Sequence, residues 1–194
     1  MTSEDRQRIG AQLRELAGLV ASDDLDGAAW AEVSELLAAA TARFPEPRAA
    51  ETRFARSDLE ASNHPIAEGS SGVYPTLDLR EDDGVLTAET RFGPAWEGPP
   101  GLVHGGFLAA GFDMVLSAAA HRVLSHSVTR RLQLRYLRPT YTGALLRYEV
   151  RAGARDGRLL ELHGTLHCDD VLTMRASAQF ASLDRTRFAD RRSG

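Results

Sequence analysis

The sequence predicts an α+β fold in which a curved antiparallel sheet wraps around one long central helix. Two observations lead to this prediction. Residues 73–183 show two strands, one helix and then four consecutive strands, with short turns between them. The helix carries apolar residues on nearly every face, and a helix of this kind is buried. About 20 residues make a helix roughly 30 Å long, which suits burial under long strands.

The N-terminal part of the chain, residues 3–44, predicts two helices. Apolar residues recur at helical spacing in two stripes, separated by Ser22-Asp23-Asp24; the stripes are Ile9, Leu13, Leu16 and Val20, then Trp30, Val33, Leu37 and Ala40. We expect a helical hairpin packed on the main domain, with a lid or an oligomerisation arm as the alternative. Residues 45–72 are rich in proline and glycine and read as a linker. The predicted domains are 1–72, 73–184 and a tail at 185–194.

The strands are predicted from alternating apolar residues and from turn residues between them. Val73–Arg80 and Val85–Arg91 flank Asp82-Asp83-Gly84, which is a hairpin signal. The central helix spans roughly Gly105 to Leu124. Four further strands follow, at Ser127–Arg138, Ala144–Ala152, Arg158–Cys168 and Leu172–Leu183, with turns at Pro139 to Gly143, Asp156-Gly157 and Asp169-Asp170.

Composition excludes several classes of protein. The 194 residues include 27 acidic and 23 basic side chains, and every basic one is arginine. Without lysine there is no Schiff-base chemistry, no pyridoxal-phosphate anchor and no phosphate-loop lysine. The single cysteine, Cys168, excludes an internal disulfide and a cysteine-rich metal site. We therefore expect no metal and no bound cofactor.

Charge and hydropathy bear on partners and location. The net charge of -4 argues against binding to duplex DNA, and we expect no nucleic-acid partner. The longest apolar window, residues 107–120, is too short to span a membrane. No secretory signal is recognisable at the N-terminus, so we expect a cytoplasmic protein.

Asp113 is the one acidic residue within the apolar helix. Burying a carboxylate without partners is costly, so its presence needs a reason. One interpretation is that Asp113 bonds a neighbouring backbone group or faces a water-filled seam. The other is a general base or nucleophile in a dry site.

A glycine-rich loop, Trp96 to Gly106, leads into this helix. The start of a helix presents unpaired N–H groups and the positive end of the helix dipole, which suit a developing oxyanion. Gly105 and Gly106 would also let a substrate carbonyl approach the backbone closely.

These residues resemble a known family. His104-Gly105-Gly106, then Asp113, then Thr129 in SVTRRLQLRYLRP are similar to the hotdog-fold acyl-CoA thioesterases of the PaaI-like (phenylacetate-pathway) type, over roughly residues 73–183. The resemblance implies that Asp113 is general base or nucleophile in thioester hydrolysis. It also implies that the Gly106 N–H polarises the thioester carbonyl, that His104 shapes the loop and that Thr129 helps to hold the attacking water.

The resemblance further implies a site between two subunits of a homodimer or a dimer of dimers, with Asp113 facing the partner's glycine loop. One departure stands out. Several members of the family carry Asn or Gln six residues before the histidine, whereas this chain has Gly98, with Glu97 beside it. A side-chain contribution from that position is therefore in doubt.

Strand alternation bears on the role of Thr129. It places Leu132, Leu134 and Tyr136 on the face toward the helix and Thr129, with Arg131, Gln133 and Arg135, on the other face. Thr129 is then either a contributor across a dimer seam or an ordinary exposed threonine.

Gly105, Phe107, Arg135 and Arg138 are the predicted substrate-binding residues. If coenzyme A binds, arginines must meet its phosphates, and the arginine-dense segment 130–138 is where we expect this contact. Two alternatives to an acyl-CoA thioesterase remain: a non-catalytic acyl-CoA-binding hotdog protein, and an enoyl-CoA hydratase of the same fold.

Overall fold

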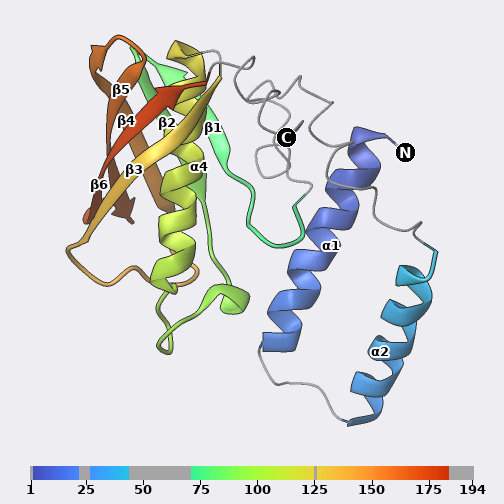
Figure 1. Cartoon of the computed structure of the whole chain (residues 1–194). Coiled ribbons are helices and arrows are strands. Elements are labelled where there is room, and N and C mark those ends of the chain that lie inside the picture. Colours follow the sequence, from blue (N-terminus) through green and yellow to red (C-terminus); the bar gives the residue numbers. More distant parts are fainter. Residues whose placement is uncertain (1, 22–26, 44–70, 125, 184–194) are drawn as a thin grey trace.

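The computed structural model describes residues 2–21, 27–43, 71–124 and 126–183. Its main body is a six-stranded antiparallel sheet curved around one long helix, as the sequence predicts (Figure 1). The helix is α4 (Gly105–Val123). The order of the strands across the sheet is β1-β2-β4-β5-β6-β3. The strands are β1 Asp78–Asp82, β2 Val85–Thr90, β3 Ser127–Tyr136, β4 Leu146–Asp156, β5 Leu159–Cys168 and β6 Val171–Ser182. The strand β3 follows the helix in sequence and forms one edge of the sheet.

The core lies between α4 and the inner face of the sheet. Phe112, Val115 and Leu116 on α4 are completely buried. They meet apolar side chains on alternate residues of the strands, among them Leu86, Tyr148, Leu162, Leu166 and Met174. Phe112 and Tyr148 pack edge to face, with ring centroids 5.0 Å apart.

Two hairpins close with two-residue turns whose backbone lies in the left-handed region. Asp83 and Gly84 have φ of 45° and 70°, and Asp169 and Asp170 have φ of 45° and 67°. Positive φ at both central residues matches the right-handed twist of the flanking strands. The turns predicted at these positions are confirmed.

The prediction that the first strand begins at Val73 is wrong. The strand begins at Asp78, and residues 73–77 lie outside the sheet although Tyr74 and Leu77 are buried. In the antiparallel register Asp78 faces Glu89, and β2 ends at Thr90. In this register Leu77 comes opposite Thr90, and residues 73–76 have no β2 residue opposite them. They are held by side chains instead, since Trp96 Nε1 donates to Val73 O at 3.0 Å.

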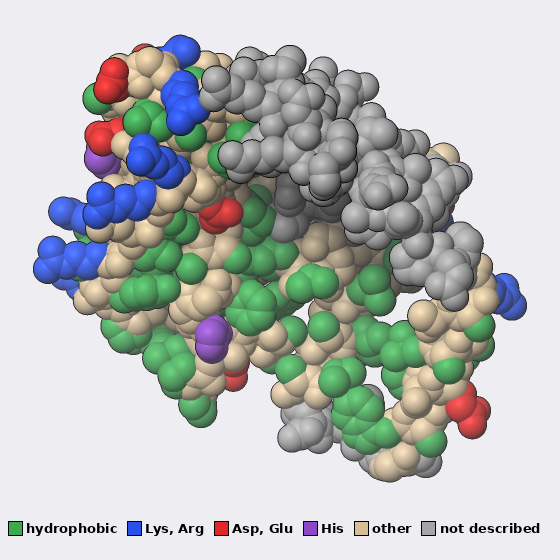
Figure 2. Space-filling model, in the orientation of Figure 1, with side chains coloured by type: hydrophobic (Ala, Val, Ile, Leu, Met, Phe, Trp, Pro, Cys, Tyr) green, Lys and Arg blue, Asp and Glu red, His purple; other side chains and the backbone are tan. Residues whose placement is uncertain are grey.

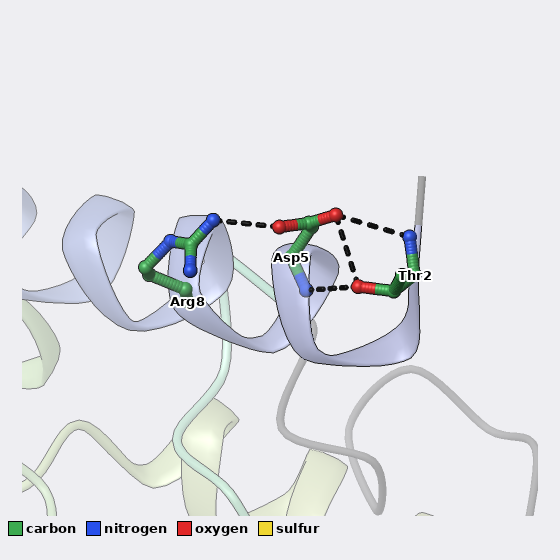
Figure 3. A network of polar contacts seen from close by, with 3 residues as sticks. All are labelled: Thr2, Asp5 and Arg8. Carbon is green, nitrogen blue, oxygen red and sulfur yellow. Dashed lines mark hydrogen bonds and ion pairs between the residues drawn. The ribbon is translucent and has the colours of Figure 1, made fainter.

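The N-terminal helix α1 (Ser3–Ala21) begins with a capping box (Figure 3). Thr2 Oγ1 accepts a hydrogen bond from Asp5 N at 3.1 Å, and Thr2 N donates to Asp5 Oδ2 at 3.1 Å. Arg8 also forms an ion pair with Asp5 at 2.6 Å. The hydrogen bond from the Thr2 backbone is the main cause of a lowered pKa of Asp5. These contacts satisfy donors that a helix start leaves unpaired.

The helix α1 packs on the domain beside the 3-10 helix η2 (Pro94–Trp96). Gly72 lies against Leu13, because a Cβ added at Gly72 would come within 2.7 Å of Leu13 Cδ1. Arg14 donates to Ser71 O. The second predicted helix is α2 (Gly27–Thr41), on which Leu36 is 64% exposed. The predicted linker and C-terminal tail fall almost entirely outside the described residues.

Gly111 allows α4 to approach the sheet closely. A Cβ at this position would overlap the hydroxyls of Tyr148 and Tyr74 and would lie 2.7 Å from Tyr148 Cζ. The Tyr74 hydroxyl donates to Phe107 O at 2.9 Å, and the Tyr148 hydroxyl donates to Leu108 O at 3.4 Å. Burial raises the pKa of both phenols, so they stay protonated and remain donors at neutral pH.

We expect Gly111→Ala to lower the free energy of unfolding by about 1–3 kcal/mol, because the added methyl overpacks a closed core. Urea denaturation at a fixed protein concentration measures the effect. The matched control is Gly18→Ala on α1, where an added Cβ meets nothing within 4 Å. This control should be neutral or stabilising by up to about 1 kcal/mol, because alanine favours helix. Equal stabilities of Gly111→Ala and the parent would contradict the close approach.

Candidate active site

Asp113 and Thr129 lie in contact within one chain. Thr129 Oγ1 donates to Asp113 Oδ1 at 2.8 Å and joins the middle of α4 to β3. The carboxylate is thus bonded by a side chain of another element rather than by a neighbouring backbone group. A hydroxyl beside a carboxylate is an arrangement that can hold and orient a water molecule.

The prediction that Thr129 points away from the helix is wrong, and a β-bulge is the reason. Thr129 pairs with Phe180 and Arg131 pairs with Gln179, so two steps along β3 match one step along β6. The extra residue, Arg130, reverses the alternation at this point. Thr129 therefore shares the inner face with Leu132, and the bulge delivers its hydroxyl to Asp113.

The carboxylate lies on a face of α4 that its own sheet leaves open. Asp113 and Met114 are half-buried, as is Phe107 earlier on the helix, whereas Phe112 and Val115 are fully buried. The expectation of a helix buried on every side is thus correct only for the sides that face the sheet. Within one chain the site is a partly exposed, largely apolar surface with one acid in it.

The loop before α4 is organised by His104, which is the N-cap of the helix. Its Nδ1 accepts a hydrogen bond from Gly106 N at 3.0 Å. His104 N in turn donates to Trp96 O at 2.8 Å, which ties the cap to the preceding loop. Since Nδ1 is the acceptor, the neutral ring carries its proton on Nε2. The side chain and the backbone of His104 thus connect the loop to the first turn of α4.

The two residues at the point of departure from the family pattern have structural partners. A Cβ on Gly98 would come within 3.1 Å of His104 Cα, so the imidazole fills the space that a side chain at 98 would take. Glu97 Oε1 accepts from Gly101 N at 3.2 Å and from Thr142 Oγ1 at 3.1 Å. Through these two hydrogen bonds Glu97 connects the glycine loop to the segment after β3.

Asp113 and the Gly106 N–H of the same chain do not come together. They are seven residues apart on one helix, which places them on the same face but about 10 Å apart along the axis. A water activated by the acid and an oxyanion donor must both lie within about 3 Å of one carbonyl group. Asp113 and the Gly106 N–H of one chain are therefore too far apart to act on the same carbonyl group.

The predicted substrate-binding arginines lie away from Asp113. Arg135 pairs directly with Arg175 of β6, on the outer face of the sheet. Arg138 follows β3, and its NH1 donates to Leu172 O at 2.9 Å. Arginine side chains project along the sheet side of the molecule (Figure 2). Two arginines directly opposite each other repel, and the structure shows no acidic partner for either among the described residues.

The sequence reasoning missed Tyr136. Its hydroxyl donates to Gly105 O at 2.9 Å, which links the end of β3 to the start of α4. Strand alternation placed Tyr136 correctly on the inner face, together with Leu132 and Leu134. A hydroxyl on an otherwise apolar strand face was the available signal.

Two further searches of the described residues concern other kinds of site. They contain no group of three or more His, Cys, Asp or Glu side chains arranged to hold a metal ion. No helix in this part of the chain is long and apolar enough to cross a membrane.

A curved antiparallel sheet wrapped around one long helix defines the hotdog fold. Residues 100–177, which include His104-Gly105-Gly106, Asp113 and Thr129, match the family model of the thioesterase superfamily. The chain therefore has the hotdog fold, and its segment 100–177 is similar to the thioesterase superfamily. No curated protein matches the sequence.

Solved structures of other proteins share this fold. A crystal structure of RHA08564, a thioesterase superfamily protein, is 21% identical with a TM-score of 0.76 and covers 91% of this chain and 90% of its own. A mutant of the phenylacetic acid degradation protein PaaI from Thermus thermophilus is 18% identical with a TM-score of 0.55, covering 62% of this chain and 100% of its own. A hypothetical thioesterase with coenzyme A from Streptococcus pneumoniae is 13% identical with a TM-score of 0.54, covering 57% and 88%.

The capping role of His104 makes a prediction about stability. We expect His104→Ala to lower the free energy of unfolding by about 0.5–2 kcal/mol, because the Gly106 N–H loses its acceptor. His104→Asn should retain most of the stability, since an asparagine side chain accepts well at an N-cap. Urea denaturation of the two variants beside the parent measures this difference. If both variants lose the same free energy of unfolding, His104 does not stabilise the protein by capping the helix.

Proposed function

We propose that this protein hydrolyses an acyl-CoA thioester to the free acid and CoA. The contact between Asp113 and Thr129 on the open face of α4 is the observation that carries the proposal. It places a carboxylate and a hydroxyl together on an otherwise apolar surface, as a site that activates water requires.

The chemistry follows from the donors and acceptors at this pair. The Thr129 hydroxyl donates a hydrogen bond to Asp113 Oδ1, so its lone pairs are free to accept a hydrogen bond from a water molecule. Oδ2 of the carboxylate is left to take the second proton of that water. In general-base hydrolysis the water oxygen attacks the thioester carbon and the carboxylate takes a proton from that water. The C–S bond then breaks and the proton passes from Asp113 to the leaving sulfur, which releases the acid and the thiol. In the nucleophilic variant Asp113 attacks the thioester carbon, the C–S bond breaks and the thiolate leaves with the anhydride formed; water then cleaves the anhydride, giving the acid, the free carboxylate and the proton that the thiolate takes up.

We propose that a second copy of the chain completes the site. The separation of about 10 Å between Asp113 and the Gly106 N–H on one helix is the supporting observation. The strand β3 carries Thr129 and forms an edge of the sheet, and such an edge readily pairs with another strand. A partner joined along this edge would bring the start of its α4 toward Asp113. The homodimer, alone or within a dimer of dimers, is then the catalytic unit.

The Gly106 N–H is the proposed oxyanion donor, with Gly105 and Phe107 beside the bound thioester. In the free protein this N–H bonds His104 Nδ1. A negatively charged oxyanion is a stronger acceptor than a neutral imidazole nitrogen, because charge-assisted hydrogen bonds are about twice as strong as neutral ones. His104 therefore holds the Gly106 N–H in place until negative charge develops on the carbonyl oxygen. The oxyanion then replaces His104 Nδ1 as the acceptor of this hydrogen bond.

Relatives in the same fold support an acyl-CoA substrate. The hypothetical thioesterase from Streptococcus pneumoniae was crystallised with coenzyme A. The PaaI protein of Thermus thermophilus is described as a phenylacetic acid degradation protein. We accordingly propose a PaaI-like enzyme and include phenylacetyl-CoA among the substrates to be tested.

We further propose that Arg135, with Arg175 opposite it, binds phosphates of CoA, and that Arg138 contributes from the segment after β3. Arg135 and Arg138 flank Tyr136, whose hydroxyl reaches the glycine loop of the same chain. Phosphates around this end of β3 would relieve the repulsion between Arg135 and Arg175. The planar guanidinium suits bidentate phosphate binding.

Replacing Asp113 tests the hydrolytic mechanism. We expect Asp113→Asn to lower kcat by about 10²–10⁴-fold, because the amide can still accept from Thr129 but cannot take a proton. Initial rates with acetyl-, octanoyl-, palmitoyl- and phenylacetyl-CoA, followed by thiol release, measure this loss. The matched control is Asp156→Asn at the exposed end of β4, which should match the parent.

Three other outcomes would contradict this function. If Asp113→Asn has the same kcat as the parent, Asp113 does not act as base or nucleophile and the proposed mechanism is wrong. Hydration of crotonyl-CoA without thiol release would indicate a hydratase. Tight binding of every acyl-CoA without turnover would indicate a binding protein.

Removing the arginines tests the phosphate contact. We expect Arg135→Ala and Arg175→Ala each to raise KM for the best acyl-CoA of the panel about threefold to tenfold with little change in kcat, because ground-state binding is lost. The dependence of KM on salt should weaken in parallel. Arg80→Ala, on β1 at the opposite edge of the sheet, is the control. An unaltered KM and salt dependence in both variants would place the phosphates elsewhere.

A further inference from the structure

The peptide group between Gly105 and Gly106 is held at both ends. Tyr136 Oη donates to its carbonyl, Gly105 O, at 2.9 Å. His104 Nδ1 accepts from its N–H, Gly106 N, at 3.0 Å. The two atoms belong to one planar amide, so fixing both of them sets the direction in which the Gly106 N–H points.

The position of Tyr136 depends on β3 and on the glycine at 105. Tyr136 pairs with the buried Met174, which places its side chain on the inner face at the end of the strand. A Cβ on Gly105 would lie 3.2 Å from Tyr136 Cε1 and 3.3 Å from its hydroxyl. The absence of a side chain at Gly105 thus lets the ring lie directly against the first turn of α4.

Tyr136 differs from the two other tyrosines that donate to this helix. Tyr74 and Tyr148 are buried, and they bond the carbonyls of Phe107 and Leu108, further along the helix from the loop. Tyr136 is 53% exposed and bonds the carbonyl of the peptide that carries the Gly106 N–H. The Tyr136 hydroxyl lies outside the buried core, and it contacts the N-terminal end of α4, where the proposed oxyanion donor lies.

We propose that Tyr136 is a positioning residue for the Gly106 oxyanion donor. A hydrogen bond to the carbonyl of an amide polarises the whole group and strengthens its N–H as a donor by about 10–30%. The hydrogen bond from Tyr136 also fixes the direction of the Gly106 N–H when the oxyanion replaces His104 as its acceptor. This inference rests on the proposed thioesterase function, in which Gly106 meets the oxyanion.

The test is Tyr136→Phe, which removes the hydroxyl and keeps the ring over Gly105. With octanoyl-CoA and phenylacetyl-CoA we expect kcat to fall about threefold to tenfold, while KM changes by less than about twofold, because the lost bond acts on the transition state. The matched control is Tyr141→Phe, an exposed tyrosine whose hydroxyl has no hydrogen-bond partner in the described part of the chain. It should keep the kcat of the parent.

A second measurement does not depend on turnover. In the protein labelled with ¹⁵N-glycine, Tyr136→Phe should move the amide resonance of Gly106 upfield, because the amide is less polarised. Size-exclusion chromatography checks that the oligomeric state is unchanged. Gly105→Ala should act in the same way by displacing the ring, and its effect on kcat should not add to that of Tyr136→Phe.

The outcomes separate this inference from the proposed function. The positioning role is overturned if the parent is active and Tyr136→Phe has the same kcat, or if the Gly106 amide resonance does not move in this variant. Either result leaves the thioesterase proposal intact. A parent that releases no thiol from any acyl-CoA in the panel would overturn the proposed function and this inference with it.

Discussion

The close approach of α4 to the sheet is the constraint on which the rest of the structure depends. It exists because Gly111 leaves room for the hydroxyls of Tyr148 and Tyr74 against the helix backbone. Those hydroxyls donate to carbonyls in the first turns of α4 and fix the height of the helix above the strands. Buried hydrogen bonds of this kind tolerate little displacement, because an unpaired buried donor is costly. The position of the glycine loop at the start of α4 follows from this packing.

One-sided burial of α4 explains why the proposed site lies on the side of the helix that the sheet does not cover. The sheet covers the face that carries Phe112 and Val115 and leaves Asp113 on a half-covered face. A carboxylate in the covered face would lack water and partners. On the open face Asp113 accepts a hydrogen bond from Thr129 and stays partly exposed, as the proposed function requires. The same surface that leaves the helix incompletely buried is therefore the one on which a shared site can form.

The start of α4 and the end of β3 act together as a support for one peptide group. His104 caps the helix and accepts from Gly106, and Tyr136 donates to Gly105. A helix N-terminus already offers partial positive charge, and the two side chains give it a defined direction. Because arginine is the only basic side chain in the protein, the phosphate-binding part of a CoA site has to be sought among residues such as Arg135 and Arg138 nearby.

The sequence by itself determined the fold class, the order of the strands along the chain and the residues of the glycine loop with Asp113. These follow from local patterns, since apolar periodicity and turn residues such as Asp83-Gly84 act over a few residues. Only the tertiary structure decided which way Thr129 faces, because one extra residue in β3 reverses alternation and a bulge has no sequence signature here. It also decided that residues 73–76 have no β2 residue opposite them, and that Tyr136 reaches Gly105 across 31 positions. Such contacts depend on register and on the spacing between layers, which are set by the packing of the whole domain and not by neighbouring residues.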